Sequence, residues 1–212
     1  MKRLILISFA VCGAIPAMAQ ISTVGAFSGA ASEGFESYPT YMNGGRYGSM
    51  DIMGGAATIN SLPISGQKFT VFDNVNATWG LTGIGFANVY AGERAVGLED
   101  LVTGQNHDWE ILFTDGAMQF GGYFSTSNNT PVTVRFFDVL DNQIGGDQVI
   151  DNPSIDAAWF GWTSTVTIAR AEFLSDASYM TMDELQVNSV PEPATMALLG
   201  LGAAALIRRR RK

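Results

Sequence analysis

Two uncharged apolar segments, one near each end of the chain, confine the part that can form a water-soluble core to residues 20–190. This middle region is long enough for one domain with a sizeable core. It carries 19 acidic residues against five basic ones, a net charge of −14, whereas the whole chain carries −8. Such a negative surface argues against a nucleic-acid partner. With 47% hydrophobic and 15% charged residues, the composition also excludes bulk disorder.

The N-terminal segment has the layout of a secretory signal peptide. Two basic residues precede the apolar run Leu4–Ile15, and Ala17 and Ala19 form the small-residue pattern before an expected cut at Gln20. An uncleaved membrane anchor is the alternative, but the apolar run is shorter than a membrane span. The only cysteine, Cys12, lies in this segment, so the mature chain has no disulfide, catalytic thiol or cysteine-ligated metal.

The C-terminal segment combines three features in order. The triplet Pro191, Glu192 and Pro193 is followed by the uncharged stretch 194–207 and a basic tail. As a helix this stretch would extend about 21 Å, so spanning a ~30 Å hydrocarbon core requires snorkelling arginines and local thinning. A buried amphipathic helix is the alternative, but the stretch is apolar all round. We therefore expect one transmembrane helix, stopped on the cytoplasmic side by Arg208, Arg209, Arg210 and Arg211.

These three features together resemble the PEP-CTERM sorting signal, which is also labelled the ice-binding protein C-terminal domain. That resemblance covers only residues 190–212. It implies a Gram-negative bacterium that makes exopolysaccharide, and an exosortase, a membrane transpeptidase-like enzyme, as the processing partner. Pro191, Glu192 and Pro193 would then be its recognition site. The two prolines fit this role, because they hold the junction extended and non-helical.

The region between the two ends is typical of an all-β domain. From residue 68 onward, short runs rich in β-branched and aromatic residues alternate with turn signals. The expected strands are 68–73, 83–90, 109–114, 118–124, 132–138, 163–168, 171–174 and 179–187, with Asp115-Gly116 as a hairpin turn. Residues 20–62 are expected to form long loops around one or two strands. The spacing favours an antiparallel β-sandwich, and we choose a jelly roll.

A second, looser resemblance concerns extracellular carbohydrate-binding jelly rolls. Gly34-Phe35-Glu36 and residues 182–187 are similar to the segments that open and close those folds. Because the first and last strands of a jelly roll can lie side by side, Glu36 would approach Asp183 and Glu184 and form an oxygen shell for a structural Ca²⁺. The alternative is that these carboxylates only face solvent.

Little in the middle region points to catalysis. His107 is the only histidine, it lies in a polar stretch, and no serine stands in a G-x-S-x-G elbow. With so many acids, spacing cannot single out a glycosidase pair. Tryptophans are the candidates for sugar stacking, although each is more often core. Among Trp79, Trp109, Trp159 and Trp162 we choose Trp109, which follows that polar stretch.

The expected organisation is a signal peptide at 1–19, a β-sandwich domain at 20–190 and a sorting segment at 191–212. We expect an exported protein without enzymatic activity. It would be anchored in the inner membrane before processing and then displayed at the cell surface or in the extracellular matrix. A structural or adhesive role with exopolysaccharide is the leading interpretation. A lectin-like module and a small secreted glycan hydrolase are the alternatives.

Overall fold

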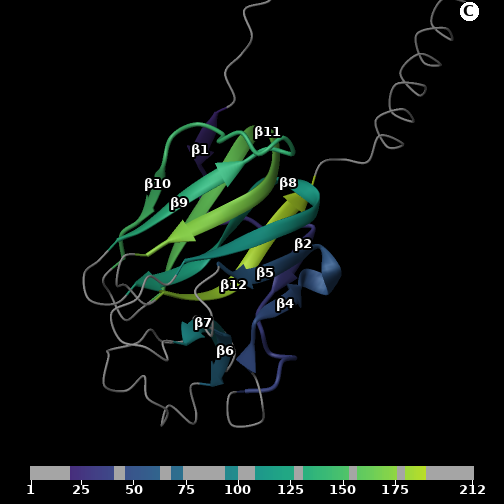
Figure 1. Cartoon of the computed structure of the whole chain (residues 1–212), viewed down its shortest axis with the longest axis vertical. Helices are drawn as coiled ribbons and strands as arrows, with labels where there is room; N and C mark the ends of the chain where they lie inside the picture. Colours follow the sequence, from purple (N-terminus) through teal and green to yellow (C-terminus); the bar gives the residue numbers. More distant parts are fainter. Residues whose placement is uncertain are drawn as a thin grey trace, which may run out of the picture.

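The computed structural model describes residues 20–40, 46–62, 68–73, 94–99, 108–126, 131–152, 157–175 and 180–189. Within these ranges nearly all regular structure is β-strand, and every strand pairs antiparallel with its neighbours (Figure 1). The shorter strands are β1 (Ile21–Thr23), β2 (Ala31–Glu33), β3 (Arg46–Tyr47), β4 (Ser49–Ile52), β5 (Ala57–Ser61), β6 (Lys68–Asp73), β7 (Arg94–Glu99), β9 (Val132–Phe137) and β10 (Gln148–Ile150). The longer ones are β8 (Trp109–Thr126), β11 (Ala158–Leu174) and β12 (Met180–Ser189), and one 3-10 turn, η2, covers Met53–Gly55.

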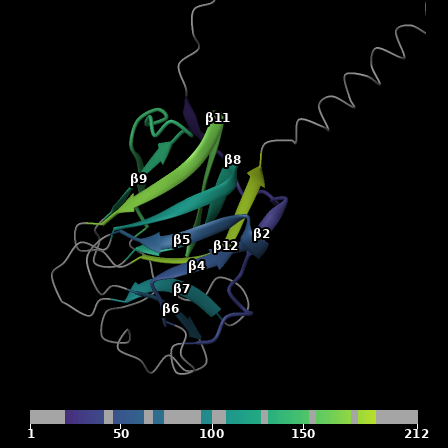
Figure 2. The same cartoon turned by 45° about the vertical axis from the view of Figure 1, so that its right-hand side comes forward.

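The strands form two layers because the two longest strands belong to both. In the first layer, residues 170–174 of β11 pair with β9, residues 109–113 of β8 pair with β5, and these halves of β8 and β11 also pair with each other. In the second layer, residues 158–163 of β11 and 117–126 of β8 lie between β1 and β12. Figures 1 and 2 show β8 and β11 as long ribbons that curve from one layer into the other.

A bend in both long strands joins the layers. We define the bend as residues 114–117 of β8 and 164–169 of β11. There the pairing of the two strands shifts register twice, between Thr163 and Ile168 and between Ile168 and Arg170. Gly116 has a φ of +73°, a conformation that glycine adopts at little cost. The expected hairpin at Asp115-Gly116 is therefore wrong, because a type I′ turn needs positive φ at both central residues, and only Gly116 has it.

Aromatic rings from the two layers meet in the core. Phe136 and Phe173 of the first layer and Phe120, Phe124 and Trp162 of the second are all buried. The ring centroids of Phe136 and Trp162 lie 5.3 Å apart, and those of Phe124 and Phe173 lie 6.0 Å apart. Rings at these separations attract one another beyond simple area burial. The antiparallel sandwich of jelly-roll type predicted from the sequence is thus confirmed.

The strand boundaries differ from expectation mainly in the N-terminal part. The predicted strand at 68–73 matches β6, and the predicted strand at 132–138 matches β9 to within one residue. Residues 20–62 hold five short strands where one or two were expected. The predicted strands at 163–168 and 171–174 are one continuous strand, β11. The predicted strand at 83–90 and the predicted membrane helix at 194–207 lie outside the described residues.

Replacing Gly116 by alanine should destabilise the sandwich by about 1–3 kcal/mol, because it adds both backbone strain and a collision with Thr167 Cγ2. Gly54→Ala is a matched control, since Gly54 also has positive φ but no neighbour within 4 Å of an added Cβ. Gly146→Ala is a second control with neither cost. Urea unfolding of the three variants measures the difference, and equal midpoints for Gly116→Ala and Gly54→Ala would show that the bend tolerates a side chain.

Candidate functional site

The outer surface of the first layer carries a row of polar side chains. In β9 the residues Val132, Val134 and Phe136 are buried, so alternation turns the intervening side chains outward. The same alternation in the neighbouring strands brings polar residues into register across the layer, because Arg135 pairs with Glu172, Glu172 with Glu110, and Glu110 with Asn60. We call this row, together with the adjacent Arg170, the polar face: Asn60, Glu110, Arg135, Arg170 and Glu172.

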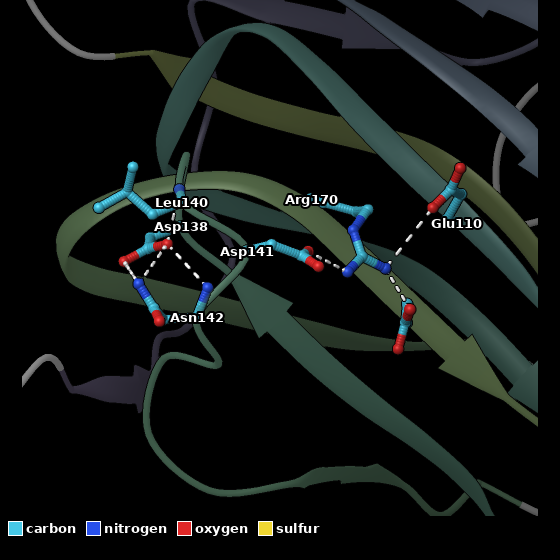
Figure 3. A network of polar contacts seen from close by, with 7 residues as sticks. Glu110, Asp138, Leu140, Asp141, Asn142 and Arg170 are labelled. Carbon is cyan, nitrogen blue, oxygen red and sulfur yellow. Dashed lines mark hydrogen bonds and ion pairs between the residues drawn. The ribbon is translucent and has the colours of Figure 1, made fainter.

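Arg170 lies at the centre of the polar face (Figure 3). Its side chain is 17% exposed, and the guanidinium carbon lies 4.0 Å from the ring centroid of Phe137. The guanidinium forms ion pairs with Glu172, with Asp141 at 2.5 Å and with Glu110 at 3.6 Å. Burial alone would lower the pKa of Arg170, but the hydrogen bonds to Asp141 and Glu172 outweigh it, so the net shift is upward. These three ion pairs hold the Arg170 guanidinium in a fixed position.

Glu110 and Glu172 stand directly opposite each other on β8 and β11. Like charges in this position repel each other unless a cation lies between them, and Arg170 contacts both carboxylates. The amide of Asn60 donates to Glu110 Oε1 at 3.4 Å, and Ser49 Oγ donates to Asn60 Oδ1 at 2.6 Å. The polar contacts therefore continue from the centre of the face to β4 at its edge.

At the other edge, Arg135 forms a bidentate pair with Asp147. Arg135 Nε lies 3.0 Å from Asp147 Oδ1 and the terminal nitrogen lies 3.1 Å from Oδ2. Gln143 Nε2 also donates to Oδ1, at 2.7 Å. The Arg135 hydrogen bond, followed by that of Gln143, lowers the pKa of Asp147. Both ends of the face thus carry fixed donors and acceptors in solvent.

Beyond β9 the chain forms a tight loop that presents two aliphatic side chains to solvent. Asp138 Oδ1 accepts the backbone N–H groups of Leu140 at 2.8 Å and Asn142 at 2.9 Å, and Asp138 N–H donates to the carbonyl of Asn142 at 3.0 Å (Figure 3). Asp141 has a φ of +63° and binds Arg170. Val139 is 73% exposed and Leu140 is 79% exposed. We call Val139 and Leu140 the tip.

The tryptophan predicted to contact sugar is instead part of the core. Trp109 is 2% exposed, stacks on Phe173 with ring centroids 3.8 Å apart, and has Phe69 at its edge. That prediction is wrong, because the ring lies on the inward-facing side of β8 and cannot reach a polymer in solvent. Trp162 is also buried, and Trp79 lies outside the described residues.

Trp159 is the tryptophan on an outer surface, that of the second layer. Its indole lies over Gly121 and Gly161, where an added Cβ would come within 2.7 Å of the ring at either position. The indole N–H donates to the carbonyl of Val24 at 3.0 Å, and Phe27 packs edge-on against the ring at 5.4 Å. These contacts hold the N-terminal segment against the sheet, so Trp159 acts first as a packing residue.

The residues predicted to bind calcium lie near the pairing of β2 with the last strand, β12, whereas the first strand, β1, pairs with β11. Strand β2 pairs with β12, and the Glu184 carboxylate lies beside Gly34. Asp183 is buried and accepts the N–H of Glu184 at 2.7 Å, while Glu36 accepts the N–H of Arg94 at 2.9 Å. Among the described residues, no three His, Cys, Asp or Glu side chains form a group that could hold a metal. Structural Ca²⁺ stays a prediction, which melting in Ca²⁺ and then in EDTA would test.

Glu33, which the sequence did not single out, holds this region together. Its carboxylate accepts the N–H groups of Phe35 and Met53, both at 2.9 Å, and the hydroxyl of Tyr38 at 3.3 Å. Phe35 and Met53 both have positive φ, at 60° and 55°, so the carboxylate supports two strained positions. Burial and then the charge of Glu33 raise the pKa of Tyr38 to about 12. No local pattern distinguishes Glu33 from Glu36, three residues later.

The remaining predicted site residues lie outside the described part of the chain. These are Ala17 and Ala19, the triplet Pro191, Glu192 and Pro193, the basic residues Arg208, Arg209, Arg210 and Arg211, and His107. Gln20 is described and is exposed at the start of the domain. Within the described ranges, no helix is long and apolar enough to span a membrane.

Residues 189–212 match the PEP-CTERM protein-sorting motif. The resemblance read from the triplet, the apolar stretch and the basic tail is thereby confirmed. A chain with this motif is an exported protein that an exosortase processes, so the comparison identifies the class of sorting signal and leaves the role of the β-sandwich open.

Three solved structures illustrate what the sandwich is similar to. The K2 cleaved adhesin domain of Lys-gingipain shares 14% identity over 74% of this chain and 96% of that chain, with a TM-score of 0.46. The CBM22-1 xylan-binding domain from Paenibacillus barcinonensis Xyn10C shares 11% identity over 79% and 100%, with a TM-score of 0.40. CsCBM6-3 from Clostridium stercorarium, in complex with cellobiose, shares 17% over 79% and 100%, with a TM-score of 0.31. No curated protein sequence matches the chain. Such low values say nothing about what this chain binds.

Replacing Glu33 by alanine should lower the free energy of unfolding by about 2–3 kcal/mol, because backbone donors lose a charged acceptor and two strained residues lose their support. Ser32→Ala, at the exposed neighbouring position of the same strand, is the control and should change little. Urea unfolding compares the two variants. Equal stability of both would contradict a supporting role for Glu33.

The loop hydrogen bonds lower the pKa of Asp138, chiefly through the backbone and side chain of Asn142. Because the folded-state pKa lies below the unfolded value, the stabilisation is present above the unfolded pKa and is lost as pH falls through the folded pKa. Carboxyl NMR titration should give Asp138 a pKa below the ordinary value of an aspartate. Asn142→Ala keeps the backbone donor and removes the side-chain donor, so it should reverse part of the shift, and an unchanged pKa would refute the side-chain contribution.

Proposed function

We propose that this protein is a non-catalytic surface protein that binds exopolysaccharide through the polar face of its β-sandwich. In this proposal the segment 194–207 holds the chain at the inner membrane until an exosortase acts near Pro191, Glu192 and Pro193. The domain is then displayed at the cell surface or in the extracellular matrix. The sorting motif at 189–212 supports the export route, and the ion-paired row across the first layer supports the binding role.

The chemistry of the polar face suits a polymer rich in hydroxyl groups. A carboxylate has two oxygens and several lone pairs, so Glu110 and Glu172 can accept sugar hydroxyls while still bound to Arg170. Arg135 and Asn60 add donors at either side. Leu112, which pairs with Arg170 across β8 and β11, is 38% exposed and offers an apolar patch to the face of a sugar ring. Because Arg170 fixes the carboxylates before binding, little side-chain entropy is lost on contact.

The proposed role of the polar face does not include catalysis. Arg170 contacts both Glu110 and Glu172, so the two carboxylates are held in place as hydrogen-bond acceptors. This arrangement supports hydrogen bonding to a polymer. A hydrolase would release reducing ends from the polymer, which a reducing-sugar assay detects.

Affinity electrophoresis of the secreted chain in gels that contain the producing bacterium's exopolysaccharide tests the binding role. Glu110→Gln with Glu172→Gln should weaken retardation roughly tenfold, since charged acceptors become neutral ones. Asp151→Asn, which removes a negative charge from an exposed residue outside the polar face, is the matched control and should bind normally. Equal retardation of all variants would contradict binding at the polar face, and binding restricted to one defined oligosaccharide would favour the lectin-like alternative.

A further inference from the structure

The start of β1 and the end of β12 both lie at the bend, and the end of β9 lies close to it. The described structure begins at Gln20, which forms two hydrogen bonds with Thr165 in the bend. The N–H of Gln20 donates to Thr165 Oγ1, and the N–H of Thr165 donates to the carbonyl of Gln20. Strand β12 ends at Ser189, which pairs with Ala117, and Ala117 pairs with Ile168. Figures 1 and 2 agree that the start of β1 and the end of β12 are at the same end of the sandwich. The segment before Gln20 and the segment after Ser189 are therefore connected to the same end of the sandwich.

The tip lies at this same end. Strand β9 ends at Phe137, which pairs with Arg170 just beyond the bend, and the loop that follows is tied back through Asp141 to Arg170. An added Cβ at Gly145, farther along the loop, would lie 3.2 Å from the backbone nitrogen of Ile21. Two strand spacings of about 4.8 Å separate Ser189 from Ile168, two residues before Arg170. The exit point of the C-terminal segment and the tip thus lie at the same end of the sandwich.

The length of chain after Ser189 limits how far the domain can move from a membrane. Only residues 190–193 separate Ser189 from the apolar stretch 194–207. Four extended residues span at most about 14 Å, and two of them are prolines that stiffen the segment. A domain held on so short a link keeps its bend end against the bilayer. Any weak contact there forms at the high effective concentration that a short tether provides.

The tip has the features of a small membrane contact and lacks those of a protein interface. Val139 and Leu140 expose aliphatic side chains from a loop whose backbone is fixed by Asp138. The nearby charges are already used inside the molecule, because Asp138 caps the loop and Asp141 pairs with Arg170. Two side chains cannot bury the roughly 1,200 Å² that a stable protein interface needs.

We propose that the tip, Val139 and Leu140, inserts into the surface of the lipid bilayer that holds the sorting segment before processing. The inference rests on the membrane-anchored state in the proposed function. The contact orients the sandwich with its bend toward the membrane and holds the junction at residues 190–193 near the bilayer surface, where a membrane enzyme acts. Cleavage there separates the domain from the membrane-anchored stretch 194–207. The tip alone then binds the bilayer too weakly to hold the domain, and the domain dissociates.

Residues 20–212 contain no cysteine, which allows a direct test with one label. Leu140→Cys in the chain from Gln20 to Lys212 is labelled with an NBD fluorophore and reconstituted into vesicles of phosphatidylethanolamine and phosphatidylglycerol that contain doxyl-labelled lipid. The expected result is a blue shift and quenching of NBD emission by the doxyl group. Val149→Cys is the matched control, because Val149 is 52% exposed on β10, opposite Thr133 and away from the bend, and its label should be unquenched.

Vesicle flotation separates the two ways in which the inference can fail. If the chain floats with the vesicles but the label at position 140 behaves like the label at 149, the tip proposal is wrong and the anchored state stands. If the chain does not float, the membrane anchor in the proposed function is wrong and the tip proposal is overturned with it. Because Leu140 is exposed, the substitution leaves the core intact, and near-UV circular dichroism confirms the fold.

Discussion

The bend shared by β8 and β11 is the constraint on which the sandwich depends. Each strand forms part of the first layer on one side of the bend and part of the second layer on the other side. The layers are therefore covalently continuous, and their inner faces meet through rings such as Phe136 and Trp162. Residues 20–190 contain no cysteine, so this continuity joins the layers where other sandwiches use a disulfide. A shift in register at the bend would displace both layers at once.

The polar face follows from the same constraint. Arg170 stands directly after the bend, where β11 enters the first layer, and it reaches Asp141 on the loop as well as Glu110 and Glu172 on the sheet. One of five cations in a strongly acidic domain thus connects the sheet surface to the loop that carries the tip. The arrangement of the three carboxylates depends on this one guanidinium group, whereas Asp138 holds the backbone of the loop. Arg170 consequently links the proposed binding face to the loop of the proposed membrane contact.

The sequence predicted elements whose local pattern decides their structure and failed where distant contacts decide it. Alternation placed β9 correctly, because buried and half-buried residues alternate along it. The β-rich run at 68–73 placed β6, in which the consecutive residues Phe69, Thr70 and Val71 are all buried. Asp115-Gly116 looks like a hairpin turn, yet pairing partners far along the chain keep β8 continuous. The ring of Trp109 follows a polar stretch but packs between Phe173 and Phe69. The role of Glu33 depends on Met53, 20 residues away, which no short pattern reveals.

The pairing of β12 with β8 also determines how the molecule bears load. In the proposed role, a polymer on the polar face would pull on the first layer, while an attachment at the C-terminal end would pull on Ser189. Between these points the force passes along β12, whose residues Met180–Ser189 pair with residues 117–126 of β8. Ladder hydrogen bonds lie perpendicular to the strands, so tension along β12 loads them in shear and all together. Loaded in this way, the ladder between β12 and β8 resists extension as a unit.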